Sequence, residues 1–284
     1  MRIGVTVGLL HPAVWRDFAI EADQLGFESL WVPEHLVFTE DMARSPYPGG
    51  KPPVVPDAQL FDAPALLSAV AQATQNIKLG TYVYLFGLRH PFVSARAFAT
   101  LDVLSGGRAL VGVGAGWMKG EWDAVQLDFA GRGRRLDEAL QVAKRLWTER
   151  VVTHHGEFYD FSGVYFEPKP VQKPHPPIIV GGTSKAALRR AARLGDGWVS
   201  MPGTLESLKP QLDLLNDLLR AEGRSRDSFQ VTVSAFEMAG PEEIREWEAL
   251  GVDRIIVRPY TRTSTAIDDL RRFAEEYGIR PGAD

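Results

Sequence analysis

An acidic side chain and an imidazole stand next to each other where a short apolar segment ends. Glu34 and His35 directly follow residues 30–33, which are apolar. An imidazole titrates near neutral pH and a carboxylate can assist it, so this pair could move a proton to or from a bound substrate. The alternative is structural, with Glu34 paired to an arginine and His35 capping a loop. The residues by themselves leave both interpretations open.

A second candidate site lies where glycines separate an apolar segment from an amphipathic one. Gly181, Gly182 and Thr183 follow residues 178–180, and Ser184 then opens a helical pattern. Glycines keep side chains away from the backbone, and the free N–H groups of a helix start bind anions such as phosphate. The alternative is an N-capped helix after a glycine turn, with no ligand.

A third glycine-rich segment, residues 111–117, contains Gly112, Gly114 and Gly116. A dinucleotide fingerprint would need its third glycine at position 117, which is Trp117, so a Rossmann-type site is disfavoured. The glycines would instead allow something flat and bulky to approach the backbone, or they mark a tight turn.

Several other chemistries lack the residues that they need. The 284 residues include no cysteine, which excludes disulfides, thiolate metal sites and a cysteine nucleophile. His154 and His155 are adjacent and lack the spacing of a metal-binding pair, and we expect no metal. No serine-hydrolase elbow is present, and only Glu34 is placed for a glycosidase, which needs two carboxylates.

Composition narrows the partners and the compartment. The net charge is −4, and Lys and Arg are interleaved with Asp and Glu, which argues against nucleic acid. No apolar run approaches the roughly 20 residues that a membrane helix needs. A chain without cysteine suits a reducing compartment, so we expect a cytoplasmic protein without membrane contact that acts on a small molecule.

The elements that must position these residues alternate between short apolar segments typical of strands and longer segments with the period of an amphipathic helix. Short β-branched segments cover residues 3–8, 29–32, 77–83, 109–113, 178–180, 197–200, 230–234 and 254–257. Amphipathic segments follow at residues 12–25, 63–74, 91–104, 135–147, 184–194, 205–221, 241–250 and 266–277. Eight strand–helix units predict an α/β protein with a single (β/α)8 TIM-barrel domain over residues 1–284, and a doubly wound open sheet is the alternative.

Two connections are longer than a barrel requires, so we expect insertions after the second strand and before the fifth. Residues 35–61 are rich in Pro and Gly and leave the end of the second strand, where barrel enzymes build their sites, so they predict a lid over the substrate. Residues 150–177 contain repeated aromatic residues and predict a small hairpin.

Taken together, these segments resemble the luciferase-like monooxygenase superfamily, whose barrels use FMN or the deazaflavin coenzyme F420. The likeness covers nearly the whole chain. It is carried by residues 29–35 (SLWVPEH), 77–81 (IKLGT), 89–91 (RHP), 99–108 (ATLDVLSGGR), 112–117 (GVGAGW), 166–172 (FEPKPVQ), 179–182 (IVGG) and 195–198 (GDGW). Within the superfamily the chain is most similar to probable F420-dependent oxidoreductases.

The resemblance assigns the cofactor to the barrel mouth. It implies that Gly181, Gly182 and Thr183 line the cofactor phosphate. It also implies that Tyr82 and Val83 form a non-proline cis peptide that bulges against the cofactor ring. The ring would also lie against Gly114 and Gly116 of the fourth strand.

The resemblance also implies a catalytic role for His35 and Glu34 near the ring, with the imidazole transferring a proton. Some deazaflavin sugar dehydrogenases of the family have an acid directly after the glycines of the fourth strand, where this chain has Trp117. Glu34, Glu121 or a lid residue could then assist His35, and the sequence does not choose among them.

The resulting prediction is an oxidoreductase that transfers a hydride between coenzyme F420 and a small organic substrate. The alternatives are an FMN-dependent flavoprotein monooxygenase and a flavin- or deazaflavin-binding protein without catalysis. The sequence does not identify the substrate. Family likeness and the apolar segment 91–104 predict a homodimer.

Overall fold

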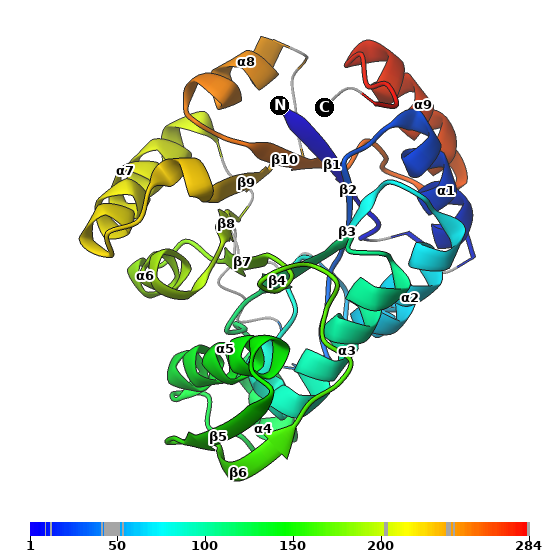
Figure 1. Ribbon diagram of the computed structural model, residues 1–284. Helices are drawn as coiled ribbons and strands as arrows, with labels where there is room; N and C mark the ends of the chain where they lie inside the picture. The colour runs from blue at the N-terminus through cyan, green and yellow to red at the C-terminus, as the bar shows by residue number, and fades with distance from the viewer. Residues whose placement is uncertain are drawn as a thin grey trace.

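Eight parallel strands form a closed barrel in the computed structural model, as the alternation of strands and helices predicts (Figure 1). The structure describes residues 1–8, 10–11, 13–40, 42, 52, 54–201, 204–236, 240 and 242–282. Around the barrel the order is β1-β10-β9-β8-β7-β4-β3-β2. The strands are β1 Arg2–Thr6, β2 Ser29–Val32, β3 Lys78–Thr81, β4 Ala109–Val113, β7 Ile178–Gly181, β8 Gly197–Val199, β9 Gln230–Ser234 and β10 Arg254–Val257.

Each strand is followed by a helix that packs outside the barrel (Figure 1). These helices are α1 Trp15–Leu25, α2 Ala63–Ala73, α3 Pro91–Leu104, α5 Arg132–Thr148, α6 Lys185–Leu194, α7 Leu205–Ala221, α8 Glu242–Ala249 and α9 Ala266–Glu276. The expected first residues of two helices, 12 and 241, lie outside the described residues. No helix in the described ranges is long and apolar enough to cross a membrane.

Among the elements whose bounds are fully described, four short helical segments were not predicted. They are α4 Lys119–Ala124 and the 3₁₀ turns η3 Phe86–Leu88, η4 Arg226–Ser228 and η5 Thr263–Thr265. Each is one or two turns long, which is too short for an amphipathic period to show in the sequence. Both α4 and η3 follow the C-terminal ends of strands, on the rim where a barrel places its site.

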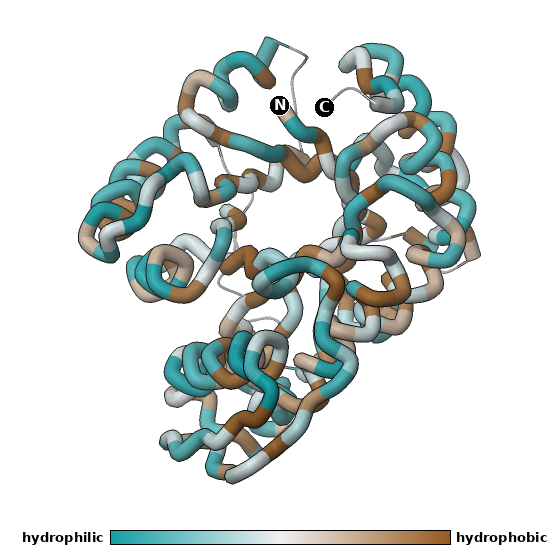
Figure 2. The backbone as a smooth tube through the Cα atoms, in the orientation of Figure 1, coloured by the Kyte–Doolittle hydropathy of each residue, from teal (hydrophilic) through white to brown (hydrophobic). Residues whose placement is uncertain are grey.

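The barrel interior is filled by large apolar side chains from different strands. Trp31, Leu110, Ile179, Val199 and Ile256 form this inner cluster, and Tyr82, Val83 and Phe236 cover it. A larger cluster fills the space between the strands and the helices. In Figure 2, hydrophilic residues prevail along outer helices such as α7 and α9.

Strand β3 ends earlier than predicted because the chain bulges at the rim. Gly80 pairs with Leu110 of β4, and pairing resumes at Tyr84 with Val113, so β3 uses one residue more than β4. The peptide bond between Tyr82 and Val83 in this bulge is cis, as the family resemblance implied.

The predicted hairpin is present as β5 Val151–His155 and β6 Asp160–Tyr165, which pair antiparallel. It lies outside the barrel beside α4 and α5 (Figure 1). The Glu138 carboxylate of α5 accepts hydrogen bonds from the Phe158 and Tyr159 amides, at 3.0 and 2.9 Å. Because Glu138 lies in the second turn of α5, the hairpin runs up the outside of the barrel towards the rim that carries the strand ends.

Candidate active site at the barrel mouth

His35 is held by an acidic residue from a distant part of the chain. Its Nδ1 lies 2.9 Å from Oε2 of Glu121, and the other oxygen of Glu121 accepts a hydrogen bond of 2.6 Å from the Leu36 amide. The Glu121 side chain is fully buried, whereas 13% of the His35 side chain is exposed. The imidazole therefore stands at the rim with a buried carboxylate behind it.

Two aromatic rings flank the imidazole. The ring of Phe38 is centred 5.1 Å from that of His35, and Trp117 meets it edge-on at 5.9 Å. Helix α4, which carries Glu121, is anchored by Trp122, whose buried ring packs with Leu85 and Leu88. The segment after β4 thus contacts His35 through both Trp117 and Glu121.

Glu34 has other partners than His35 and Glu121. Its carboxylate accepts hydrogen bonds from the Leu85 amide and from Arg89, both at 2.7 Å. Burial raises the pKa of the Glu34 carboxyl, and Arg89 and the Leu85 amide oppose that shift. The structure therefore places Glu121, and not Glu34, against His35. The structural alternative for Glu34, pairing with an arginine, is confirmed, and a catalytic role for Glu34 stays a prediction.

The bulge with the cis bond between Tyr82 and Val83 covers the inner barrel cluster and lies beside Gly114 and Gly181. A Cβ on Gly114 would lie 2.6 Å from one methyl of Val83, and a Cβ on Gly181 would lie 2.7 Å from the other. The Tyr82 hydroxyl donates to the Ser200 carbonyl at 3.1 Å. Tyr82 and Val83 therefore reach across the mouth from β3 towards β7 and β8.

The glycines of β4 accommodate the protein's own bulge. A Cβ on Gly112 would stand only 1.7 Å from the Thr81 carbonyl oxygen, so this position excludes a side chain. The Gly112 carbonyl also accepts hydrogen bonds from the Thr81 hydroxyl and the Tyr84 amide, both at 2.7 Å. Thr81 of β3 thus makes the close approach at Gly112, and Val83 of the bulge makes that at Gly114. Contact of a cofactor with Gly114 and Gly116 remains a prediction.

The turn after β7 has the features of an anion site. Gly182 has φ +114°, in the region that favours glycine, and its carbonyl accepts a hydrogen bond of 2.7 Å from the Trp198 indole. The Ser184 hydroxyl caps α6 by accepting from the Ala187 amide at 3.2 Å. Residues 183–186 are exposed, and none of the described residues accepts a hydrogen bond from their amides. These N–H groups at a helix start fit the phosphate end of a cofactor.

The structure describes 16 of the 27 residues of the predicted lid, residues 35–61. Residues 41, 43–51 and 53, which include most of its prolines and glycines, lie outside the described residues. Within the described part of this connection, Leu36, Val37, Val55 and Phe61 are exposed large apolar side chains. They place apolar surface along the connection that begins at His35.

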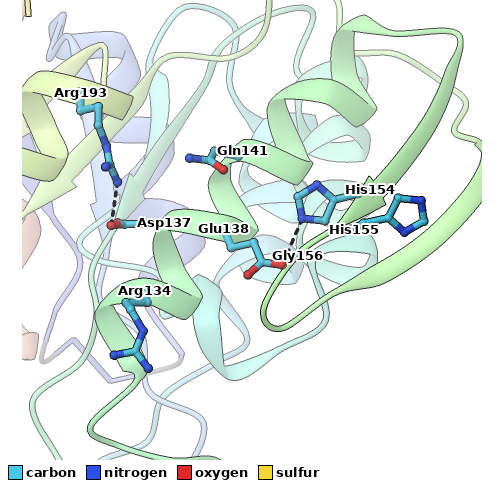
Figure 3. A pocket seen from close by; sticks show the side chains of 8 residues that line it. All are labelled: Arg134, Asp137, Glu138, Gln141, His154, His155, Gly156 and Arg193. Carbon is cyan, nitrogen blue, oxygen red and sulfur yellow. Dashed lines mark hydrogen bonds and ion pairs between the residues drawn. The ribbon is translucent and has the colours of Figure 1, made fainter.

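A groove of about 400 Å³ lies away from the mouth, between α5, α6 and the hairpin (Figure 3). Four of the side chains that line it form two ion pairs, Arg193 with Asp137 at 2.9 Å and His154 with Glu138 at 3.1 Å. Among the described residues, no group of three or more His, Asp or Glu could hold a metal ion. We therefore place the candidate active site at the barrel mouth.

Comparison with known proteins agrees with this architecture. The chain is 33% identical to an uncharacterized protein of Mycobacterium tuberculosis over 91% of this chain and 90% of the relative. It is 32% identical to an F420-dependent glucose-6-phosphate dehydrogenase of Kineococcus radiotolerans, over 78% of this chain and 63% of the relative. An FMNH₂-dependent dimethylsulfone monooxygenase of Pseudomonas putida is 35% identical over 62% of this chain and 48% of the relative.

Among solved structures, an F420-dependent secondary alcohol dehydrogenase in complex with an F420-acetone adduct superposes with a TM-score of 0.79 at 19% identity, covering 98% of both chains. At this identity the likeness establishes the shared barrel fold. The family model for luciferase-like monooxygenases matches residues 10–280. The chain therefore belongs to the luciferase-like monooxygenase family.

Proposed function

We propose that this protein is an F420-dependent oxidoreductase that transfers a hydride between the deazaflavin and a small organic substrate. The observation that carries the proposal is the His35 imidazole, held by Glu121 at the barrel mouth and flanked by two aromatic rings. The F420-dependent relative is similar over most of this chain and supports the choice of cofactor.

The residues of this chain would bind the cofactor, orient the substrate and exchange a proton with it. The amides of residues 183–186 would hold the cofactor phosphate, and Tyr82 and Val83 would support its ring. A bound deazaflavin supplies two-electron hydride chemistry. For an alcohol substrate, His35 would accept the hydroxyl proton as the hydride leaves the adjacent carbon, and Phe38 and Trp117 would shield the site from water.

An FMN-dependent monooxygenase is the second candidate, and the FMNH₂-dependent relative favours it. The barrel mouth described above suits either cofactor, because both have a tricyclic ring and a phosphate. A cofactor-binding protein without turnover is a third candidate. The Glu121–His35 contact argues against it, because binding alone does not need an imidazole held ready for proton transfer.

Titration of the purified protein with F420 and with FMN, followed by fluorescence quenching, tests the proposal. Thr183 is exposed at the proposed phosphate site, so Thr183→Asp adds a negative charge there, and Thr183→Asn is its uncharged match. A substitution at Gly182 would confuse charge with backbone strain, because its φ is +114°. We expect F420 to bind the wild type. Thr183→Asp should weaken it at least about tenfold, equivalent to about 1.4 kcal/mol, and Thr183→Asn should weaken it much less.

Binding of FMN alone would replace the proposal with the monooxygenase. Binding of neither cofactor would reject both. If F420 binds and both Thr183 variants weaken it equally, the phosphate does not lie at the start of α6. Turnover with secondary alcohols and ketones, measured with the cofactor that binds, would then separate an enzyme from an inert binding protein.

A further inference from the structure

The two oxygens of Glu121 have different partners, and this difference constrains the proton on His35. Oε1 accepts from the Leu36 amide, which can only donate, and Oε2 faces Nδ1 of His35 at 2.9 Å. An ionised carboxylate can only accept hydrogen bonds. Nδ1 must then carry the hydrogen, which leaves the lone pair of the neutral imidazole on Nε2.

The surroundings keep the imidazole in this orientation. Phe38 and Trp117 contact the ring, and Glu121 is fully buried behind it. Glu121 is fixed in turn because the neighbouring Trp122 is buried against the η3 turn. Rotation of the imidazole would break the hydrogen bond to a carboxylate that has no access to water.

We propose that Glu121 is the positioning residue that fixes His35 in the Nδ1–H tautomer and directs Nε2 towards the substrate. The assignment deepens the proposed function and rests on it for the identity of the reaction. The same carboxylate accepts a hydrogen bond from the Leu36 amide. It therefore fixes the backbone at the start of the connection after β2 together with the imidazole.

The Glu121→Gln variant gives a signature that a merely structural role would not produce. The Leu36 amide still needs an acceptor, so the glutamine oxygen should remain there and its NH₂ group should turn towards Nδ1 of His35. A donor at this place forces Nδ1 to accept, and the imidazole should change to the Nε2–H tautomer. The wrong tautomer cannot accept a proton at Nε2.

Nitrogen-15 NMR of protein labelled in its histidine rings measures the tautomer directly, without cofactor or substrate. With six histidines in the chain, a His35→Gln variant identifies the His35 signals. We expect a protonated Nδ1 in the wild type and in Glu121→Asp, which keeps an acceptor, and a protonated Nε2 in Glu121→Gln. Asp123→Asn, an exposed acid-to-amide change on the same helix, should leave the tautomer as in the wild type.

In turnover, Glu121→Gln should lower kcat about 100-fold and leave KM within about threefold, and Glu121→Asp should recover part of the rate. A protonated Nε2 in the wild type would overturn the inference, and the wild-type spectrum decides this even if Glu121→Gln does not fold. A retained Nδ1–H in a folded Glu121→Gln protein would also overturn it. The expected tautomers without F420 binding would uphold the positioning role and reject the proposed cofactor.

Discussion

At the scale of single residues, Gly112 of β4 lets the backbone of the neighbouring strand β3 approach closely. A side chain there would meet the Thr81 carbonyl oxygen, which is part of the backbone and cannot rotate away. Both the pairing of β3 with β4 and the bulge at residues 82 and 83 depend on this close approach. The glycine is therefore required by the protein itself, whatever ligand the barrel mouth binds.

The Gly112→Ala substitution should lower the free energy of unfolding by about 3 kcal/mol, the upper part of the usual range for overpacked interiors. Urea denaturation measures this loss. Gly240→Ala is the matched control, because no atom of the described residues lies within 4 Å of a Cβ there, and its effect should stay within about 0.5 kcal/mol. Equal stability of Gly112→Ala and the wild type would show that β3 does not approach β4 this closely.

At the scale of elements, a carboxylate of α5 holds the turn of the hairpin against the barrel. Glu138 accepts from two hairpin amides and contacts His154, and 11% of its side chain is exposed. A Cβ on Gly156 would stand 2.1 Å from Oε1 of Glu138, so this glycine lets the turn approach the carboxylate. A two-stranded hairpin has little stability of its own and needs such an anchor.

Replacing Glu138 with Ala should loosen the hairpin and leave the barrel intact. Losing hydrogen bonds to a charged group costs about 1.5–3 kcal/mol each, so amide exchange in residues 151–165 should accelerate at least about tenfold. Hydrogen exchange followed by mass spectrometry checks this. Glu157→Ala, an exposed acid in the same turn, should have little effect. Uniformly faster exchange across the whole chain would argue against a local anchor.

At the scale of the whole molecule, an ion pair beneath the barrel joins the end of the chain to its beginning. Arg254 of β10 donates two hydrogen bonds of 2.7 Å to Glu28, which precedes β2, and thus spans β1. Burial by itself raises the pKa of Glu28, but Arg254 and Lys78 outweigh it and lower the pKa from 4.5 to about 2. The pair therefore favours closure of the barrel whenever Glu28 is ionised.

This pair predicts a defined pH dependence of stability. Because the folded pKa lies below the unfolded value, the stabilisation is complete above about pH 4.5 and is lost as the pH falls towards about 2. Glu28→Gln should cost about 3 kcal/mol at pH 7, and the cost should shrink across that window. Urea denaturation at a series of pH values measures it, with the exposed Asp217→Asn as control. A cost that stays constant down to pH 2 would contradict this origin.

The order and type of the main elements could be predicted from the sequence because they follow from local periodicity. All eight barrel strands and their helices occur where the apolar patterns place them. The largest differences between predicted and observed elements have local causes. Residues 82 and 83 leave β3 because the chain bulges there, and α4 is too short to show a helical period. The cis bond between Tyr82 and Val83 was implied by family resemblance and not by the local pattern. The homodimer and the single-domain organisation remain predictions.

The sequence by itself determined that His35, the turn after β7 and the glycines of β4 lie on one rim, because parallel strands bring their C-terminal ends to the same end of a barrel. Only the tertiary structure decided which groups they meet. Glu121 is 86 residues from His35 and contacts it, whereas the adjacent Glu34 is taken by Arg89. Glu34 and His35 both lie beyond the end of β2, and the partner of each side chain is set by packing between elements that no local pattern records.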